Sequence, residues 1–186
     1  LRGLPQHSYE EYCGFVGNGI LRLVERALPE PLRTPHTVAA VRRDFVEYYT
    51  AHIDLRTRPY EGIPELLRTL AARGVRLAVA SNKFQAGTSK LVARFFPDVE
   101  FAAVLGQREG VALKPDPAVA EEILHRVPVP RDRVLFVGDS GIDMQTAAAA
   151  GIRSVGVTWG FRARTELVEA GADHLIDTPA ALLDLL

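Results

Sequence analysis

Beyond residue 58, short valine-rich apolar runs alternate with segments of helical periodicity, and this alternation constrains the fold more than any other feature. The apolar runs predict strands at 75–80, 102–105, 134–137, 154–157 and 174–176. Strands that alternate with helices are joined by right-handed crossovers and lie side by side in one direction. The pattern therefore predicts an α/β fold with an open, mostly parallel sheet and helices on both faces.

Residues 1–58 show only helical patterns and predict a small α-helical cap domain, followed by an α/β core over residues 59–186. Ser8 and Glu11 have the spacing of a capping box at a first helix. Thr34 and Pro35 predict the start of a later helix. That helix should be amphipathic, with a stripe formed by Val38, Val41, Phe45, Tyr48 and His52.

Composition excludes several classes of protein. The 186 residues include 22 basic and 23 acidic side chains, a formal net charge of -1. A chain so balanced has no broad field for nucleic acid or an anionic membrane, so we expect neither as a partner. The single cysteine, Cys13, cannot form an internal disulfide, and no charged-then-apolar leader is visible, which favours a cytoplasmic location. No apolar run approaches the roughly 20 residues of a membrane span.

Polar residues collect where the predicted strands end. Ser81 and Asn82 follow the first strand, Lys114 follows the second, Asp139 follows the third and residues 158–160 follow the fourth. Ligands of open parallel sheets bind beyond the carboxyl ends of the strands. We therefore expect four loops to meet at one site.

Ser81-Asn82-Lys83 is predicted to lie where a strand gives way to a helix. The unpaired N–H groups and the dipole of a helix start favour an anion such as phosphate, and Ser81 and Asn82 could donate to its oxygens. An ordinary helix cap, with no ligand, is the alternative interpretation of these residue types.

Lys114-Pro115-Asp116-Pro117 places a lysine beside two prolines that stiffen the backbone, and Asp116 is positioned to cap the following helix. A fixed ammonium group suits a phosphoryl oxygen and offsets the charge of an attacking carboxylate. The alternative is a solvated surface lysine next to a cap.

Asp139 ends an apolar strand after Gly138, and Asp143 follows four residues later at the start of an alanine-rich helix. Two carboxylates that face one point suit Mg²⁺, which takes oxygen ligands together with substrate phosphate and water. Acidic residues are also favourable at a helix start without any metal, and that interpretation remains open.

Gly17-Asn18-Gly19 breaks the helical pattern of the cap domain. It is either a simple helix break or a flexible polar tip at which Gly17 and Asn18 close over a substrate.

Together these residues resemble the haloacid dehalogenase (HAD) superfamily of phosphohydrolases, and especially its phosphoglycolate phosphatase-like branch. The resemblance implies a Rossmann-like core with a helical cap. By the same resemblance Ser81 and Asn82 bind the transferring phosphoryl group and Lys114 orients and neutralises it. Asp139, with Lys114, belongs to the catalytic set and is a ligand of Mg²⁺, and Asp143 supports the metal site.

One motif of the resembling superfamily is absent: the Asp-x-Asp-Gly-Thr segment that ends the first core strand and supplies the nucleophile. The chain begins at Leu1 and its one methionine is Met144. We expect roughly 30 to 40 residues before Leu1, carrying the start of the cap, that strand and its nucleophile. The 186 residues alone should then be inactive.

The resemblance thus implies a Mg²⁺-dependent phosphatase of a small phosphorylated metabolite, monomeric or homodimeric, that acts through an aspartyl-phosphate. Phosphoglycolate is the substrate suggested by analogy. The alternatives are a sugar-phosphate mutase or pyrophosphatase of the same superfamily, and a non-catalytic phosphate-binding or interaction protein.

Overall fold

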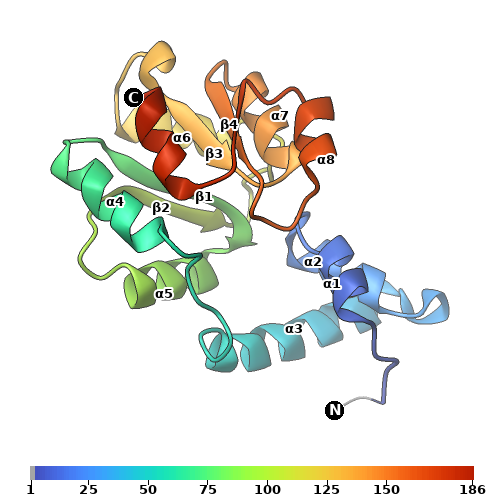
Figure 1. Ribbon diagram of the computed structural model, residues 1–186. Helices are drawn as coiled ribbons and strands as arrows, with labels where there is room; N and C mark the ends of the chain where they lie inside the picture. The colour runs from blue at the N-terminus through green and yellow to red at the C-terminus, as the bar shows by residue number, and fades with distance from the viewer. Residues whose placement is uncertain (1–2) are drawn as a thin grey trace.

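A computed structural model describes residues 3–186 and shows a helical region followed by a mixed α/β region (Figure 1). The helical region, hereafter the cap, contains α1 (Tyr9–Phe15), α2 (Gly19–Ala27), the 3-10 helix η1 (Glu30–Leu32) and α3 (Pro35–His52). Within the described chain, no strand precedes Leu77. The predicted boundary between residues 58 and 59 falls in the connection from α3 to α4 (Ile63–Ala72).

Side-chain caps begin two of the cap helices. The backbone N–H of Ser8 donates to Glu11 Oε2 at 2.7 Å, and the N–H of Glu11 donates to Ser8 Oγ at 3.1 Å, so the predicted capping box is confirmed. Thr34 Oγ1 accepts a hydrogen bond from the N–H of Thr37 at 3.2 Å, with Pro35 in the first helical position. Both starts follow from local sequence alone.

The prediction of an apolar stripe along α3 is wrong at the C-terminal end of the helix. Val38 is buried against α2, but Tyr48 is 58% exposed and stacks on the exposed His52, with ring centroids 4.1 Å apart. The second half of α3 has a different partner: Tyr49 approaches Phe84 of the core, with ring centroids 6.2 Å apart. The buried face of the helix therefore rotates along its length.

In the part of the chain that the structure describes, five strands form two wholly parallel sheets. β1 (Leu77–Phe84) pairs with β2 (Phe101–Gln107), and the second sheet has the order β3 (Leu135–Gly138), β4 (Arg153–Val157) and β5 (His174–Ile176). All five predicted strands are present, and the α/β class is confirmed. The expected single sheet is divided, because β1 and β3 each pair on one side only among the residues described.

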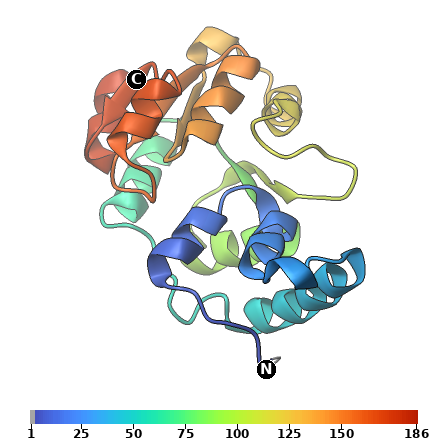
Figure 2. The same ribbon diagram turned by 90° about the vertical axis from the view of Figure 1, so that its right-hand side faces the viewer.

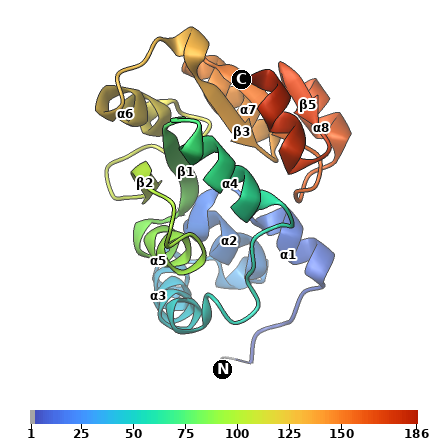
Figure 3. The same ribbon diagram turned by 60° about the vertical axis from the view of Figure 1, so that its left-hand side comes forward.

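Helices cover both faces of the strands. The remaining elements are α5 (Gln85–Phe95), α6 (Ala118–Arg126), η2 (Arg131–Arg133), α7 (Gly141–Ala149), α8 (Arg164–Glu169) and η3 (Pro179–Leu185). On one face, α4 and η3 pack against Val155 and Val157 of β4. On the other, α6 and α7 enclose Phe136 of β3. Figure 3 shows α4 in front of β1, with α6 to the left of the strands.

The end of β1 leaves its ladder. Between the paired residues Ala80 and Phe84, residues 81–83 oppose only Gly106 of β2. Gln85 Oε1 replaces a lost ladder bond by accepting from the N–H of Gly106 at 2.7 Å. A Cβ at position 106 would lie 2.6 Å from the carbonyl oxygen of Lys83, so only glycine fits this close approach. Such a bulge changes the direction in which side chains point.

The cap lies at one end of the molecule, with the first described residues on its outer side and the C-terminus at the opposite end (Figure 2). The start of α2 meets the core at Leu113: a Cβ on Gly19, whose φ is +80°, would lie 2.8 Å from Leu113 Cδ1. Of the helices described, none combines the length and apolar character needed to cross a bilayer.

Candidate active site

Lys114 lies in the connection from β2 to α6 and reaches the ends of both sheets. Its Nζ donates to the carbonyl oxygen of Ala80 in β1 at 3.0 Å and pairs with Asp143 Oδ1 at 2.7 Å. Only 11% of the Lys114 side chain and 9% of the Asp143 side chain are exposed. A buried ion pair needs additional hydrogen bonds to offset the lost hydration, and Ala80 supplies one. The ammonium is therefore held between the two sheets.

Asn82 joins three segments of the chain. Its Oδ1 accepts from the N–H of Lys114 at 2.9 Å, and its Nδ2 donates to the carbonyl oxygens of Lys114 and Gly17 at 3.0 and 2.9 Å. These bonds bring Asn82 to the predicted place, but they occupy its amide. The side chain therefore positions the Lys114 loop and the cap loop.

Ser81 is not at a helix start, which corrects the prediction made from the tripeptide 81–83. These residues form the bulge at the end of β1, and α5 begins only at Gln85. Ser81 Oγ accepts a hydrogen bond from the N–H of Lys83 at 3.1 Å, which closes the bulge. Among residues 3–186 no acceptor takes its hydroxyl proton, so the candidate role rests on the hydroxyl and not on a helix dipole.

Asp139 directly follows β3 and packs against the loop after β4. Its Oδ2 accepts from the N–H of Phe161 at 2.9 Å. A Cβ on Gly160 would lie 2.2 Å from the Cβ of Asp139, so this contact requires glycine. The loops after β3 and β4 thus meet as predicted, although the backbone donor of Phe161 had no signal in the sequence.

Asp143 accepts hydrogen bonds on both carboxylate oxygens. Besides the Lys114 ion pair, Asp143 Oδ2 accepts from the N–H of Ser140 at 3.2 Å and from Ser140 Oγ at 2.7 Å. These donors fix the carboxylate at the start of α7 and leave it little capacity to bind a metal directly.

The donor set at this site suits Mg²⁺ in part. Among residues 3–186, no cluster of three or more His, Cys, Asp or Glu side chains could hold a metal. Mg²⁺, however, is commonly bound by only one or two carboxylates together with substrate and water. In the described chain, hydrogen bonds engage Asp139 Oδ2 but not Oδ1. Asp139 therefore fits a direct ligand, and Asp143 fits a residue that orients the site.

The cap loop approaches these residues through its backbone. The carbonyl of Gly17 accepts from Asn82, and the carbonyl of Val16 accepts from Arg162 Nη2 at 2.9 Å. Asn18 Oδ1 instead accepts from Arg26 Nη1 at 3.0 Å, within the cap. Gly17 is thus brought to the site, whereas the Asn18 side chain oxygen is occupied inside the cap. Arg162 had no recognisable signal, because its partner lies 146 residues away in the sequence.

Tyr60, in the connection from α3 to α4, responds electrostatically to Asp139. Burial raises the pKa of the Tyr60 phenol, and the negative charge of Asp139 raises it further. The phenol therefore stays protonated at neutral pH and presents an O–H group near the site. Sequence reasoning did not single out this residue.

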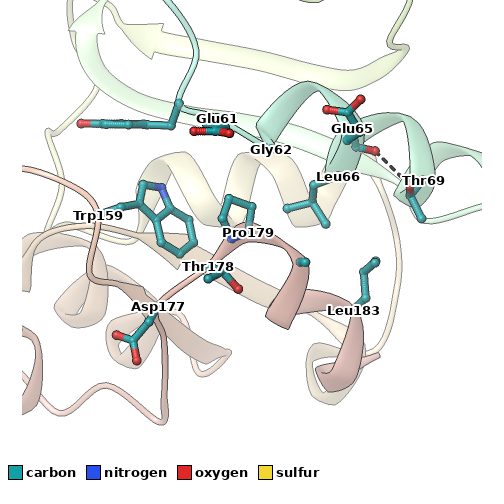
Figure 4. Close-up of a pocket in the computed structure, with 12 residues that line it drawn as sticks. Glu61, Gly62, Glu65, Leu66, Thr69, Trp159, Asp177, Thr178, Pro179 and Leu183 are labelled. Atoms are coloured by element: carbon teal, nitrogen blue, oxygen red, sulfur yellow. Dashed lines mark hydrogen bonds between the residues drawn. The ribbon is translucent and has the colours of Figure 1, made fainter.

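An open cavity of about 530 Å³ lies beside the charged site and not within it (Figure 4). Its apolar wall is formed by Leu66, Trp159, Pro179 and Leu183. Glu65 of α4 and Glu61, just before that helix, also line it. It shares the loop after β4 with Asp139, but Ser81, Lys114 and Asp139 do not line it.

Comparison with known proteins gives the class. The haloacid dehalogenase-like hydrolase family matches residues 3–157, and this chain belongs to that family. The predicted superfamily, and with it the expectation of a hydrolase, is confirmed.

Three individual proteins show in more detail what this chain is similar to. The phosphoglycolate phosphatase of Pectobacterium atrosepticum is 32% identical over 189 residues, which cover 100% of this chain and 80% of that protein. The crystal structure of a predicted phosphoglycolate phosphatase from Haemophilus somnus has a TM-score of 0.90 at 28% identity and covers 98% of this chain and 84% of that one. CbbY from Rhodobacter sphaeroides, in complex with phosphate, has a TM-score of 0.76 at 26% identity and covers 94% and 80%.

Proposed function

We propose that the protein is a Mg²⁺-dependent phosphatase that hydrolyses a small phosphomonoester, with phosphoglycolate as the favoured substrate. The observation that carries the proposal is the position of Lys114, whose buried ammonium lies between β1 and the start of α7. The phosphoglycolate phosphatase relatives and the phosphate bound to CbbY support the choice of substrate class.

Each site residue then has a role. Ser81 donates its hydroxyl proton to a phosphoryl oxygen, and Lys114 neutralises charge on the phosphoryl group as the ester bond breaks. Asp139 is the Mg²⁺ ligand, while Asp143 fixes Lys114 and the start of α7. The metal ion supplies further charge neutralisation to the phosphate when bound. Gly17 and Asn18 belong to the cap loop that closes over the substrate and excludes water.

The nucleophile in this proposal is an aspartate on a strand that precedes Leu1. Its carboxylate attacks phosphorus, the ester P–O bond breaks, and the alcohol leaves with a proton from the second aspartate of the same motif. Water then hydrolyses the aspartyl-phosphate. The one-sided pairing of β1 and β3 supports a further strand, because each carries unpaired backbone groups along one edge of the described sheet.

The other expectations from the sequence complete the proposal. The protein acts on a small phosphorylated metabolite in the cytoplasm, as a monomer or homodimer. A mutase or pyrophosphatase of the same superfamily would need the same phosphate site, so these activities differ in product and not in the residues above.

A phosphate-release assay on the natural full-length protein tests the function. We expect Mg²⁺-dependent release of inorganic phosphate from phosphoglycolate, abolished by EDTA and restored by added Mg²⁺. The 186-residue chain alone should show no turnover. An isomerised phosphate ester without phosphate release would indicate a mutase, and cleavage of pyrophosphate in preference to every monoester would indicate a pyrophosphatase. Activity that survives complete metal removal would contradict the role of Asp139.

A further inference from the structure

The three lysines of the chain lie in different electrostatic surroundings. Lys114 is paired with Asp143, and the exposed Lys90 donates to the carbonyl oxygen of Thr50 at 2.8 Å. Lys83 is half-buried, and no carboxylate of residues 3–186 lies within ion-pair distance of its Nζ. A partly desolvated ammonium without an anion is unfavourable unless a ligand supplies the charge.

Lys83 has a neutral partner in the cap. Its Nζ donates to the phenol oxygen of Tyr49 at 2.6 Å and lies 4.6 Å from the centroid of that ring. An ammonium group has three N–H donors, and the phenol uses one. Because Tyr49 accepts from Lys83, its own O–H proton remains free to donate. The pair therefore offers one positive charge and donors from two side chains.

The pair lies next to the phosphate-binding residues. Lys83 is two residues after Ser81 in the bulge, and its N–H is bonded to Ser81 Oγ. Asn82, between them, bonds the cap loop at Gly17. Lys83 thus lies where α3 of the cap meets the end of β1.

We propose that Lys83 and Tyr49 form a subsite for a second anionic group of the substrate, a carboxylate one or two carbons from the phosphate ester. The subsite rests on the proposed phosphatase function and deepens it. It gives a role to a pair of residues that the proposed chemistry does not use. One ammonium and one phenol match the single charge of a carboxylate. A second phosphate carries about two charges at neutral pH and is usually met by forked, bidentate donors such as arginine.

Two substrates of nearly equal size test the subsite in the natural full-length protein. Phosphoglycolate carries the carboxylate, and 2-hydroxyethyl phosphate carries a neutral CH₂OH group in its place. We expect Lys83→Met to lower kcat/KM for phosphoglycolate roughly 10- to 100-fold, mainly through KM, because a hydrogen bond to a charged group is lost. The kcat/KM for 2-hydroxyethyl phosphate should change less than about twofold, because its neutral CH₂OH group does not interact with the Lys83 charge.

Two variants complete the design. Lys90→Met makes the same substitution at an exposed lysine and should leave both substrates unaffected. Lys83→Arg keeps the charge and should restore most of the preference for phosphoglycolate. Equal losses on both substrates, or no loss on phosphoglycolate, would overturn the subsite while leaving the phosphatase function intact. A wild-type protein that hydrolyses neither ester would overturn both proposals.

Discussion

The core and the cap differ in how much apolar surface they bury. In the described chain, the core holds three clusters of buried apolar side chains that join helices to both sheets, whereas the cap holds one, formed by Val24, Leu28 and Val38. Burial of a large apolar side chain contributes about 1.5–3 kcal/mol. The core is therefore the more stable support, and the groups of the site that carry fixed charge, Lys114, Asp139 and Asp143, all lie in it.

Several of the contacts between the two regions are single polar bonds. Asn82 bonds the carbonyl of Gly17, Arg162 bonds the carbonyl of Val16, and Lys83 bonds Tyr49. Contacts of this kind break and re-form at small cost in free energy because water can replace them. The comparison teaches that the core fixes the positions of the charged site residues, while the cap controls substrate access and selectivity.

The largest effect is expected from the core charge at position 139. Asp139→Asn should lower kcat roughly a thousandfold, or about 4 kcal/mol, because a neutral amide is a poor Mg²⁺ ligand. Thermal unfolding should change little, since an amide oxygen can still accept from the N–H of Phe161. Asp98→Asn, at an exposed residue, is the matched control. Activity near the wild-type level would remove Asp139 from the metal site.

Cavity-creating substitutions in the cap and in the core should destabilise different parts of the protein. Leu28 is 2% exposed in the cap and Leu167 is fully buried in the core, so alanine at either position should cost about 3 kcal/mol. Hydrogen exchange should show that Leu28→Ala accelerates amide exchange in α1–α3 and leaves β4 protected. Leu167→Ala should instead lower the global free energy of unfolding. Equal acceleration in β4 by both variants would show that cap and core unfold as one unit.

A smaller effect is expected where the loop after β4 holds the cap. Arg162→Ala removes the bond to Val16 and should raise KM by roughly tenfold or less with kcat nearly unchanged, since the closed cap is less populated. Arg164→Ala, which breaks an exposed ion pair with Asp177, should leave KM unaltered. A fall in kcat with constant KM would place Arg162 in the chemistry itself.

The smallest effect concerns the core alone. Hydrogen bonds from the N–H and hydroxyl of Ser154 lower the pKa of Asp173. Its stabilisation is therefore complete above the unfolded pKa of about 3.9 and is lost as pH falls through the lower folded pKa. Asp173→Ala should cost about 1 kcal/mol at pH 6, and the difference from wild type should vanish at low pH. A difference that does not shrink as the pH falls below the unfolded pKa of about 3.9 would contradict the carboxylate's role.

Local patterns predicted much of the fold. The capping box of Ser8 and Glu11 and the five strands depend on neighbours in sequence, and the structure contains them. The bulge at 81–83 could not be predicted, because it depends on the bond between Gln85 and Gly106, a residue 21 positions away in the neighbouring strand. The exposure of Tyr48 likewise depends on where α3 leaves α2 and meets the core.

The site shows the same division. Lys114, Asp139 and Asp143 were predicted from short motifs, and the structure brings Lys114 and Asp143 into contact. The occupied amide of Asn82 was not foreseen, because it depends on a carbonyl 65 residues away in the cap. Contacts made by backbone groups, such as the N–H of Phe161 on Asp139, leave no trace in residue identity.

The affinity for inorganic phosphate tests most directly whether the two sheets hold a phosphoryl group between them. Inhibition by phosphate should be measured in the natural full-length protein with Mg²⁺ present, for wild type, Lys114→Met and the exposed control Lys90→Met. The account predicts that Lys114→Met raises the inhibition constant at least about tenfold, as expected for loss of a charge-assisted contact, and that Lys90→Met leaves it unchanged. An unchanged constant in a folded Lys114→Met protein would contradict the account.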